Sequence, residues 1–556
     1  MSAAVAATSA RNAKIGLIAA LLARVEPAEV PAAVAFLSGE LLQRQIGVGY
    51  AAIGGVFARG GAAAEVVRAG EAAPDEEEVQ AAAADAAGDA ARRPAAPALT
   101  LTEVDAAFTA IGLVTGPGSQ AQRRLLLTGL FARATDPERE FLVRLLAGDL
   151  RQGALEGVMT DAVARAAGVP ADEVRRAHQL GGSLPEVAGA ALADTRSPDR
   201  ALAALRGFTL RVGRPARPML AASAPDVAAA LGRVSGPLSP AAAEWKIDGI
   251  RIQVHRAGGE VAVFTRTLDD ITARVPEIAE AALSLPVTSA VLDGEAVALA
   301  PDGTPRPFQV TAARTASQAD AGRLRDETPL TPFLFDLLYL DGTDLIDAPA
   351  SERHRQLSRI APAAMLAPRI VTGDLTAAEA FFADAVAHGH EGIVVKSLDA
   401  PYRAGRRGGE WIKVKPRHTL DLVILAAEWG HGRRRGVLSN LHLGARDPET
   451  GGMIMLGKTF KGLTDEMLAW QTGTLLELAE PAAQIPAQAD RRQAHGVVWV
   501  RPELVVEIAF DGVQASSRYP GGLALRFARV LRFRPDKKAA DADTINSVRA
   551  IWSGKA

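Results

Sequence analysis

The sequence predicts a multidomain protein with an all-α N-terminal domain, an α+β central domain and an all-β C-terminal domain. Apolar residues recur at intervals of three and four up to about residue 205. Short β-rich runs alternate with turns beyond about residue 211, and about 120 residues of short strands follow Pro416. The length of 556 residues agrees with several domains, because one hydrophobic core rarely serves more than about 250 to 300 residues.

The first domain is expected over residues 1–205. Leu17 and Leu21 belong to its helical pattern, which resumes over residues 120–134 and 138–150. Between about residues 62 and 97 the chain is a low-complexity stretch of Ala, Glu and Asp. Residues 61–100 hold eight acidic side chains and three arginines, which predicts an exposed acidic excursion there.

The central domain is expected over residues 206–416. Pro215 and Pro218 lie in the segment where the composition changes, which is typical of a domain boundary. Strands are predicted at residues 251–256, 261–265, 290–300, 333–340, 392–396 and 411–414. Helices are predicted at residues 317–325 and 377–387.

The C-terminal domain is expected over residues 417–535. Its short strands are interrupted by one helical stretch around residues 465–478. A chain of this length made of short strands suits a small closed barrel such as an OB-fold. Residues 536–556 are expected to form a C-terminal tail.

The composition predicts a globular protein of the cytoplasm. Hydrophobic residues make up 48% and charged residues 23% of the chain. The sequence holds no run of 18 apolar residues and no long apolar stretch near its start, so it predicts neither a membrane span nor a secretory signal. It has no cysteine, which excludes disulfides, thiolate zinc sites and a cysteine nucleophile.

Charge is unevenly distributed along the chain. The formal net charge is −2, which argues against a protein coated in basic surface. Residues 401–461 nevertheless hold twelve Arg and Lys against five acidic residues. Such a stretch is typical of a localised phosphate-binding surface, although an ordinary solvated face would have the same composition.

The segment EWKIDGIR places Lys246 two residues before an Asp-Gly turn. A lysine amine can attack a nucleotide α-phosphate and hold the nucleotide as a phosphoramidate, so Lys246 is the candidate nucleophile. Alternation on both sides of Gly249 predicts two strands joined there, with Glu244 on the same face as Lys246. Alone, such a string more often marks a structural lysine beside a turn.

Two carboxylate motifs lie downstream of Lys246. In LDGEAVAL, Asp293 and Glu295 share one face of a predicted strand, and in HEGIVVKS Glu391 precedes a valine-rich strand. Oxygen ligands of this kind suit Mg²⁺, which takes one or two protein carboxylates together with phosphate. A single Glu at a strand end is more often a plain surface residue. One of these motifs alone therefore does not predict a metal site.

The segment WIKVKP alternates Lys413 and Lys415 with apolar residues, so two ammonium groups stand on one face of a strand. Adjacent cations repel each other unless an anion lies near them, and a phosphate meets that need. Like charges also lower the pKa of a nearby lysine. This matters because an ordinary lysine, with a pKa of about 10.4, is a free amine only about once in a few thousand at neutral pH.

Other residues could complete a nucleotide site. In FLFDLLYL, Phe333, Phe335, Leu337 and Tyr339 are predicted on one face, as a core stripe or, at its rim, a surface for a purine. Arg251 and Arg266 lie on polar sides of strands, where arginine can fork onto phosphate or sugar oxygens. Residues 526–538 hold six cations and one acid, which favours phosphate contact.

Taken together, these motifs resemble ATP-dependent DNA ligases of the prokaryotic type, in the covalent nucleotidyltransferase superfamily. The resemblance covers nearly the whole chain, with seven motifs in order over about 290 residues. They are EWKIDGIR, FTRTLDD, LDGEA, FLFDLLYLDG, HEGIVVKS, RRGGEWIKVKP and LRFARVLRFRPDK. Two N-terminal strings, FLSGELLQRQIGVGYA and FLVRLLAGDLRQGALEG, are similar to the helical DNA-binding domain of these ligases.

The resemblance implies a role for each matching residue. Lys246 would become adenylylated, Glu244 would read the adenine amino group and Phe335 would stack on the adenine. The other implied contacts are Arg251 and Arg266 with ribose and phosphate, Glu295 with ribose or metal, Glu391 with the divalent ion, Arg407 and Lys413 with the nucleotide, Lys415 with the α-phosphate and Arg526 with pyrophosphate.

The resemblance also implies an activity and its partners. AMP would pass from ATP to Lys246, then to the 5′-phosphate of a nick, and the 3′-hydroxyl would displace it, with Mg²⁺ or Mn²⁺ as the metal. The expected partner is nicked duplex DNA, bound by a monomer near the nucleoid. The alternatives are a catalytically silent nick-binding protein and an RNA ligase or capping-type nucleotidyltransferase. An NAD-dependent ligase would be expected to carry a zinc module with cysteines, and this sequence has no cysteine.

Overall fold

The computed structural model describes residues 1–44, 46–49, 99–150, 152–194, 197–234, 240–317, 319–403, 408–431, 434–480 and 496–553. The chain divides into two compact units, Met1–His390 with Val394–Lys413, and Glu391–Ile393 with Val414–Ala556. The expected acidic excursion at residues 62–97 lies outside the described residues, as does Arg407. Within the described part of the chain, no helix is long and apolar enough to cross a membrane.

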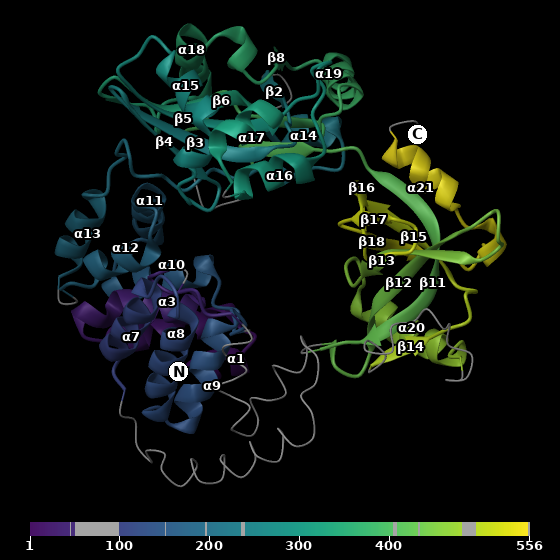
Figure 1. The fold of residues 1–556 in the computed structure, drawn as a ribbon, viewed down its shortest axis with the longest axis horizontal. Helices are drawn as coiled ribbons and strands as arrows, with labels where there is room; N and C mark the ends of the chain where they lie inside the picture. Colours follow the sequence, from purple (N-terminus) through teal and green to yellow (C-terminus); the bar gives the residue numbers. More distant parts are fainter. Residues whose placement is uncertain are drawn as a thin grey trace. The chain divides into compact units, whose positions relative to one another are not determined.

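Helices form the N-terminal region of the first unit (Figure 1). They are α1 (Ser2–Ala7), α2 (Arg11–Leu22), η1 (Pro27–Glu29), α3 (Val30–Ser38), α7 (Leu101–Leu113), α8 (Ser119–Ala132), α9 (Asp136–Leu146), α10 (Glu156–Ala167), α11 (Ala171–Gly181), α12 (Leu184–Ala191) and α13 (Pro198–Arg206). Thr100 and Thr135 begin α7 and α9 with capping boxes.

The helix expected at 138–150 is α9, which ends earlier than predicted. Ala147 caps it, and Gly148 follows with a φ of 65°. Glycine enters this left-handed region without steric cost and so ends a helix readily. The helix expected at 120–134 corresponds to α8.

Two apolar clusters hold the helical region together. In one, Ile18 of α2 and Met159 of α10 are fully buried. In the other, Phe36 of α3 meets Phe108 of α7 edge to face, with ring centroids 5.8 Å apart.

The remainder of the first unit mixes helices and strands. The elements are β1 (Ala222–Ser223), α14 (Val227–Val234), β2 (Ala241–Trp245), β3 (Ile250–Ala257), β4 (Glu260–Thr265), η3 (Thr272–Arg274), α15 (Pro276–Leu283), β5 (Ser289–Ala298), α16 (Phe308–Ala316), α17 (Ala321–Glu327), β6 (Leu330–Leu340), β7 (Thr343–Asp344), α18 (Ala350–Ile360), η4 (Ala363–Met365), β8 (Arg369–Thr372), α19 (Leu375–Ala387), β9 (Ile393–Lys396) and β10 (Trp411–Val414).

These strands build two five-stranded sheets in the described residues. One has the order β4-β3-β5-β6-β7 and the other β1-β10-β9-β2-β8. The two strands predicted around Gly249 are present as β2 and β3, but they belong to different sheets. The segment that carries Lys246 is therefore the crossing point between the sheets.

Two details of this region differ from the prediction. The helix expected at 317–325 corresponds to α17, which begins later than predicted, because Asp320 starts it by accepting a hydrogen bond from the Arg323 backbone N–H, 2.8 Å. Strands β1, β7 and β8 and the helices α14, α15, α16 and α18 have no counterpart among the predicted elements.

The third difference concerns the faces of β6. The register against β5 shifts twice, so Phe335 and Leu338 are extra residues without a paired position. As a result Leu337 packs in a different apolar cluster from Phe335 and Tyr339. The predicted single stripe from Phe333 to Tyr339 is wrong for this reason.

The second unit is rich in strands. Its elements are β11 (His418–Trp429), β12 (Leu438–Arg446), β13 (Met453–Thr459), α20 (Asp465–Glu477), β14 (Val497–Trp499), β15 (Val505–Phe510), β16 (Gly512–Ala515), β17 (Leu523–Arg526), β18 (Arg529–Phe533), η8 (Ala539–Asp541) and α21 (Ile545–Trp552). The main sheet has the order β13-β12-β11-β15-β18, with β14 also paired to β11, and β16 pairs with β17. In the expected tail, Ile545 and Val548 of α21 are buried in the core of this unit.

Candidate active site

Lys246 follows β2 directly and is half-buried. Three residues later, a Cβ added to Gly249 would lie 2.3 Å from the carbonyl oxygen of Ala296 and 3.0 Å from Cγ of Glu295. Only a residue without a side chain allows so close an approach. The segment with Lys246 therefore lies flush against β5, at Glu295.

Glu244 is buried between two cations from the neighbouring strands. It is 2% exposed. Its Oε1 accepts a hydrogen bond from Nη1 of Arg369, 3.0 Å away, and its Oε2 forms a close ion pair with Nζ of Lys396. Buried carboxylates persist in proteins when they are paired in this way.

Lys396 lies within the motif HEGIVVKS but was not among the predicted site residues, and the structure places it beside Glu244. Burial lowers the pKa of its amine, while Glu244 and Asp336 oppose that effect. The Nζ atom lies 4.2 Å from the ring centroid of Trp411 and 4.6 Å from that of Phe335, within the range of cation–π attraction. A lysine at the end of the buried strand IVVK was the available signal, because lysine is rarely buried without a partner.

Arg251 forms a two-point ion pair with Asp293. Its Nε and Nη2 lie 3.0 and 2.6 Å from Oδ1 and Oδ2, and the Tyr402 hydroxyl donates to Oδ2 at 2.6 Å. Burial alone would lower the pKa of Arg251, but Asp293 and Tyr402 raise it above its ordinary value. Burial and Asp293 raise the pKa of Tyr402. Glu295 pairs with Arg251 in the β3–β5 register.

Phe335 belongs to the same group of side chains. Its ring meets Trp411 edge to face at 6.0 Å, and the guanidinium carbon of Arg251 lies 5.5 Å from its centroid. Contacts thus connect Glu244, Lys396, Phe335 and Arg251. Of the other predicted residues in this unit, Arg266 is exposed in the turn after β4, and Lys413 lies in β10 beside β1.

The second unit holds three further candidates. Nζ of Lys415 lies 2.8 Å from Oε1 of Glu391 and 3.7 Å from Oδ2 of Asp511. The anion expected next to Lys415 is thus supplied here by carboxylates. Arg526 ends β17, and its carbonyl accepts a hydrogen bond from the Asp511 N–H at 3.0 Å.

The basic residues at 526–538 are less available for contact with phosphate than their sequence suggests. Arg532 pairs with Glu507 at 2.6 Å. Arg534 and Lys537 both pair with Asp421, at 2.9 and 2.5 Å. Carboxylates of the same unit therefore face at least three of the six cations counted in the sequence.

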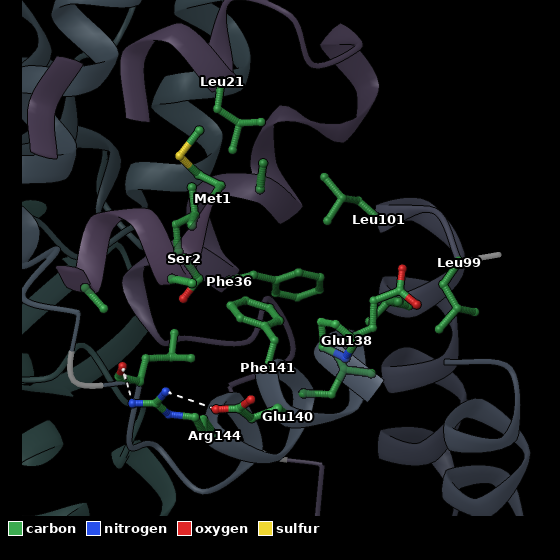
Figure 2. A pocket seen from close by; sticks show the side chains of 18 of the residues that line it. Met1, Ser2, Leu21, Phe36, Leu99, Leu101, Glu138, Glu140, Phe141 and Arg144 are labelled. Atoms are coloured by element: carbon green, nitrogen blue, oxygen red, sulfur yellow. Dashed lines mark hydrogen bonds and ion pairs between the residues drawn. The ribbon is translucent and has the colours of Figure 1, made fainter. Parts of the chain in front are cut away.

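A cavity of about 430 Å³ lies elsewhere, in the helical region (Figure 2). Its walls are mainly apolar, and Arg144 and Glu140 form an ion pair of 3.6 Å beside it. The lining residues include Met1, Leu21, Phe36, Leu99, Leu101, Phe141 and Leu150. None of the predicted site residues lines it, and apolar walls do not suit phosphate chemistry.

Comparison with known proteins agrees with the fold along almost the whole chain. Residues 2–164 match the family model "DNA ligase N terminus", residues 218–415 "ATP dependent DNA ligase domain" and residues 434–537 "ATP dependent DNA ligase C terminal region". A probable DNA ligase of Mycobacterium sp. (strain KMS) is 55% identical over 553 residues, which are 99% of this chain and 97% of the relative.

Two further comparisons extend this result. A probable DNA ligase of Anaeromyxobacter dehalogenans (strain 2CP-C) is 52% identical over 557 residues, covering 100% of this chain and 98% of that protein. A solved structure titled "Pmar-Lig_Pre" covers 96% of this chain and 98% of its own, with a TM-score of 0.58 and 15% identity. At that identity the likeness is one of fold alone.

The order of a helical region, a central adenylation domain and a β-rich C-terminal region is that of a multidomain nick-sealing enzyme. The chain belongs to the ATP-dependent DNA ligases. It uses ATP to seal nicks in duplex DNA, as the sequence motifs predicted. These matches do not favour an RNA ligase, a capping enzyme or a catalytically silent binding protein.

Proposed function

We propose that Lys246 is the nucleophile of the ligation reaction. The observation that carries this is the crossing segment between the two sheets, where Gly249 seats the lysine's neighbours directly against Glu295. The Nζ atom forms a bond with the α-phosphorus of ATP as the bond to pyrophosphate breaks. AMP then passes to the 5′-phosphate at the nick, and the 3′-hydroxyl displaces AMP to close the strand.

The nucleoside is held by the buried group around Glu244. The Glu244 carboxylate accepts a hydrogen bond from the exocyclic amine of adenine, and Phe335 stacks on the purine. Arg251 and Arg266 contact ribose and phosphate oxygens. The contacts of Glu244 and Arg251 with their partners support this, because ion-paired side chains are fixed before the nucleotide arrives.

Arginine and lysine side chains bind the phosphates of the nucleotide. We assign the nucleotide phosphates to Arg407, Lys413 and Lys415, and the leaving pyrophosphate to Arg526. Cations aimed at the charge that develops in the transition state are the main means by which phosphoryl transfer is accelerated.

A divalent ion, Mg²⁺ or Mn²⁺, is proposed at Glu295 and Glu391. The donor chemistry fits, because carboxylate oxygens with phosphate are the usual Mg²⁺ ligands in proteins. Asp293 is a poor choice, since Arg251 and Tyr402 occupy both of its oxygens. When bound, the ion would neutralise charge on the phosphate oxygens.

The domains are proposed as an all-α DNA-binding domain at 1–205, the adenylation domain at 206–416, an OB-fold at 417–535 and a C-terminal segment at 536–556 whose helix α21 packs into the core of the second unit. The helices up to Arg206 and the β13-β12-β11-β15-β18 sheet support this division. We further propose a monomer that works on DNA in the cytoplasm, with the segment near Pro416 as a hinge.

The test of the nucleophile is covalent labelling. Wild-type protein incubated with ATP labelled at the α-phosphate should retain label after denaturing electrophoresis, and Lys246→Ala should not. Lys14→Ala is the matched control, because Lys14 lies in α2 of the helical region and should label normally. A covalent adenylate on the Lys246→Ala protein would overturn the assignment.

A further inference from the structure

Arg369 has no place in the motifs of the family resemblance, yet it contacts a residue of the nucleotide site. It begins β8, the edge strand beside β2, and stands directly opposite Glu244 in the antiparallel register. Its side chain is 10% exposed, and Nη1 donates to Oε1 of Glu244 at 3.0 Å. The pair is thus fixed by the backbone register and is largely withdrawn from water.

The second cation on Glu244 has a different environment. Lys396 lies on the opposite side of β2, at the end of β9, and its ammonium faces the rings of Trp411 and Phe335. A lysine ammonium is a point charge on a flexible stem, whereas the planar guanidinium of arginine constrains the orientation of its acceptor. Arg369 is therefore the partner that sets the plane of the Glu244 carboxylate.

A carboxylate that is paired with two cations can still accept a hydrogen bond from a further donor. An ionised carboxylate offers about four lone-pair sites, and the two cations described here take one on each oxygen. The remaining sites can accept from an amine and repel a carbonyl oxygen. How well they discriminate depends on how firmly the carboxylate is oriented.

We propose that Arg369 is a positioning residue for nucleobase selection: it holds Glu244 so that the site accepts a 6-amino purine and rejects a 6-oxo purine. This inference rests on the proposed function, in which Glu244 reads the adenine amine. Removing Arg369 leaves Glu244 with Lys396 alone, and the carboxylate can then turn away from the base.

The test compares ATP with inosine triphosphate, which differs at the 6-position by carrying an oxygen in place of the amine. The rate of covalent nucleotide transfer to the protein, without DNA, is measured against nucleotide concentration for both nucleotides. In Arg369→Met, we expect kcat/KM for ATP over that for inosine triphosphate to fall by about 10-fold or more, because a hydrogen bond to a charged group is worth a factor of this order. The loss should lie mainly in KM for ATP, because chemistry at Lys246 is untouched.

Three variants make the result specific. Arg369→Lys should recover part of the selectivity because it keeps a cation at this position. Arg359→Met removes an exposed arginine of α18 and should keep the wild-type ratio. Glu244→Gln should relax selectivity, because an amide offers both a donor and an acceptor. Adding Arg369→Met to Glu244→Gln should then lower the ratio no further, since residues that act through one another are non-additive.

The outcomes separate the two claims. If Glu244→Gln loses selectivity while Arg369→Met and Arg369→Lys keep the wild-type ratio, the role of Arg369 is refuted and base reading by Glu244 stands. If Glu244→Gln keeps the ratio as well, base reading by Glu244 fails and the inference fails with it. Thermal unfolding of each variant shows whether it is folded, and the lysine variant carries the test if the methionine variant is not.

Discussion

At the scale of single residues, the site is made of charges that are buried in pairs. Glu244 lies between Arg369 and Lys396, and Asp293 binds Arg251 and the Tyr402 hydroxyl. Burying a lone charge is costly, whereas a paired and hydrogen-bonded one is tolerated. We propose that these pairs fix the side chains of the site before the nucleotide binds.

Gly249 provides a prediction at this scale. In Gly249→Ala the new Cβ would meet backbone oxygen of Ala296 at 2.3 Å, and two backbone segments would have to separate. We expect a stability loss of about 1 to 3 kcal/mol, as for other overpacked positions. We also expect a larger proportional loss of lysine adenylylation, measured by label retained from ATP, because the segment with Lys246 must move off β5.

The matched control is Gly259→Ala, in the turn between β3 and β4. No atom outside its neighbours lies within 4 Å of the position of an added Cβ, so both stability and adenylylation should stay near wild type. Equal behaviour of the two alanine variants would show that the close approach at Gly249 has no part in the site.

At the scale of elements, the two bulges of β6 decide what faces the site. They turn Phe335 toward Trp411 and Arg251, and the strand also carries Asp336, which is buried against Arg353 of α18. Burial alone would raise the pKa of Asp336, but Arg353 and Lys396 lower it. Helix α18 is thereby attached to β6 by a buried ion pair.

That ion pair can be tested by Arg353→Met. Arg353 is fully buried, and it binds Asp336 through Nε at 2.7 Å and Nη2 at 3.0 Å and donates to the carbonyl of Ala400. Its loss leaves a buried carboxylate without its main partner, which should lower the free energy of unfolding by about 3 to 5 kcal/mol in urea denaturation. The double variant Arg353→Met with Asp336→Leu should recover much of this loss.

Arg355→Met is the control on the same helix. Arg355 pairs with Glu352 at the exposed surface, where ion pairs add little to stability, so its urea midpoint should barely change. A midpoint for Arg353→Met close to that of Arg355→Met would contradict the structural role given to the buried pair.

At the scale of the whole molecule, the residues proposed for the site belong to both units. The first unit carries Lys246 and the buried residues around Glu244, and the second carries Lys415, Glu391 and Arg526. The net charge is only −2, so phosphate binding must rely on local groups of cations. Family membership adds that the substrate is a nick, and we propose that the protein recognises it through its sugar-phosphate backbone.

We therefore expect affinity for nicked duplex DNA to depend on salt and not on base sequence. Neutralising phosphates releases counterions, so the dissociation constant should rise about 10- to 1,000-fold between about 50 and 200 mM salt. The measurement is equilibrium binding of Lys246→Ala protein to labelled nicks of unrelated sequence, since this variant should not turn over. Affinity that is insensitive to salt, or that differs widely between sequences, would contradict backbone recognition.

The sequence alone was enough to predict the family, the order of its helical, central and β-rich regions and six strands of the central region. Strand β10 lies at the predicted residues, and β2 and β3 lie on either side of the segment with Lys246, as expected. These features are local: they follow from alternation, from turn residues and from motif spacing, which a one-dimensional pattern contains.

Tertiary structure decided which residues meet. Arg369, Lys396 and Tyr402 lie 125, 152 and 109 positions from the carboxylates they bind, and β2 and β3 enter different sheets although they are neighbours in the chain. The bulges that turn Phe335 depend on pairing with β5 and not on the sequence of β6 alone. Partners, register and burial are properties of the folded chain, because side chains far apart in sequence satisfy each other's charge only after the sheets have formed.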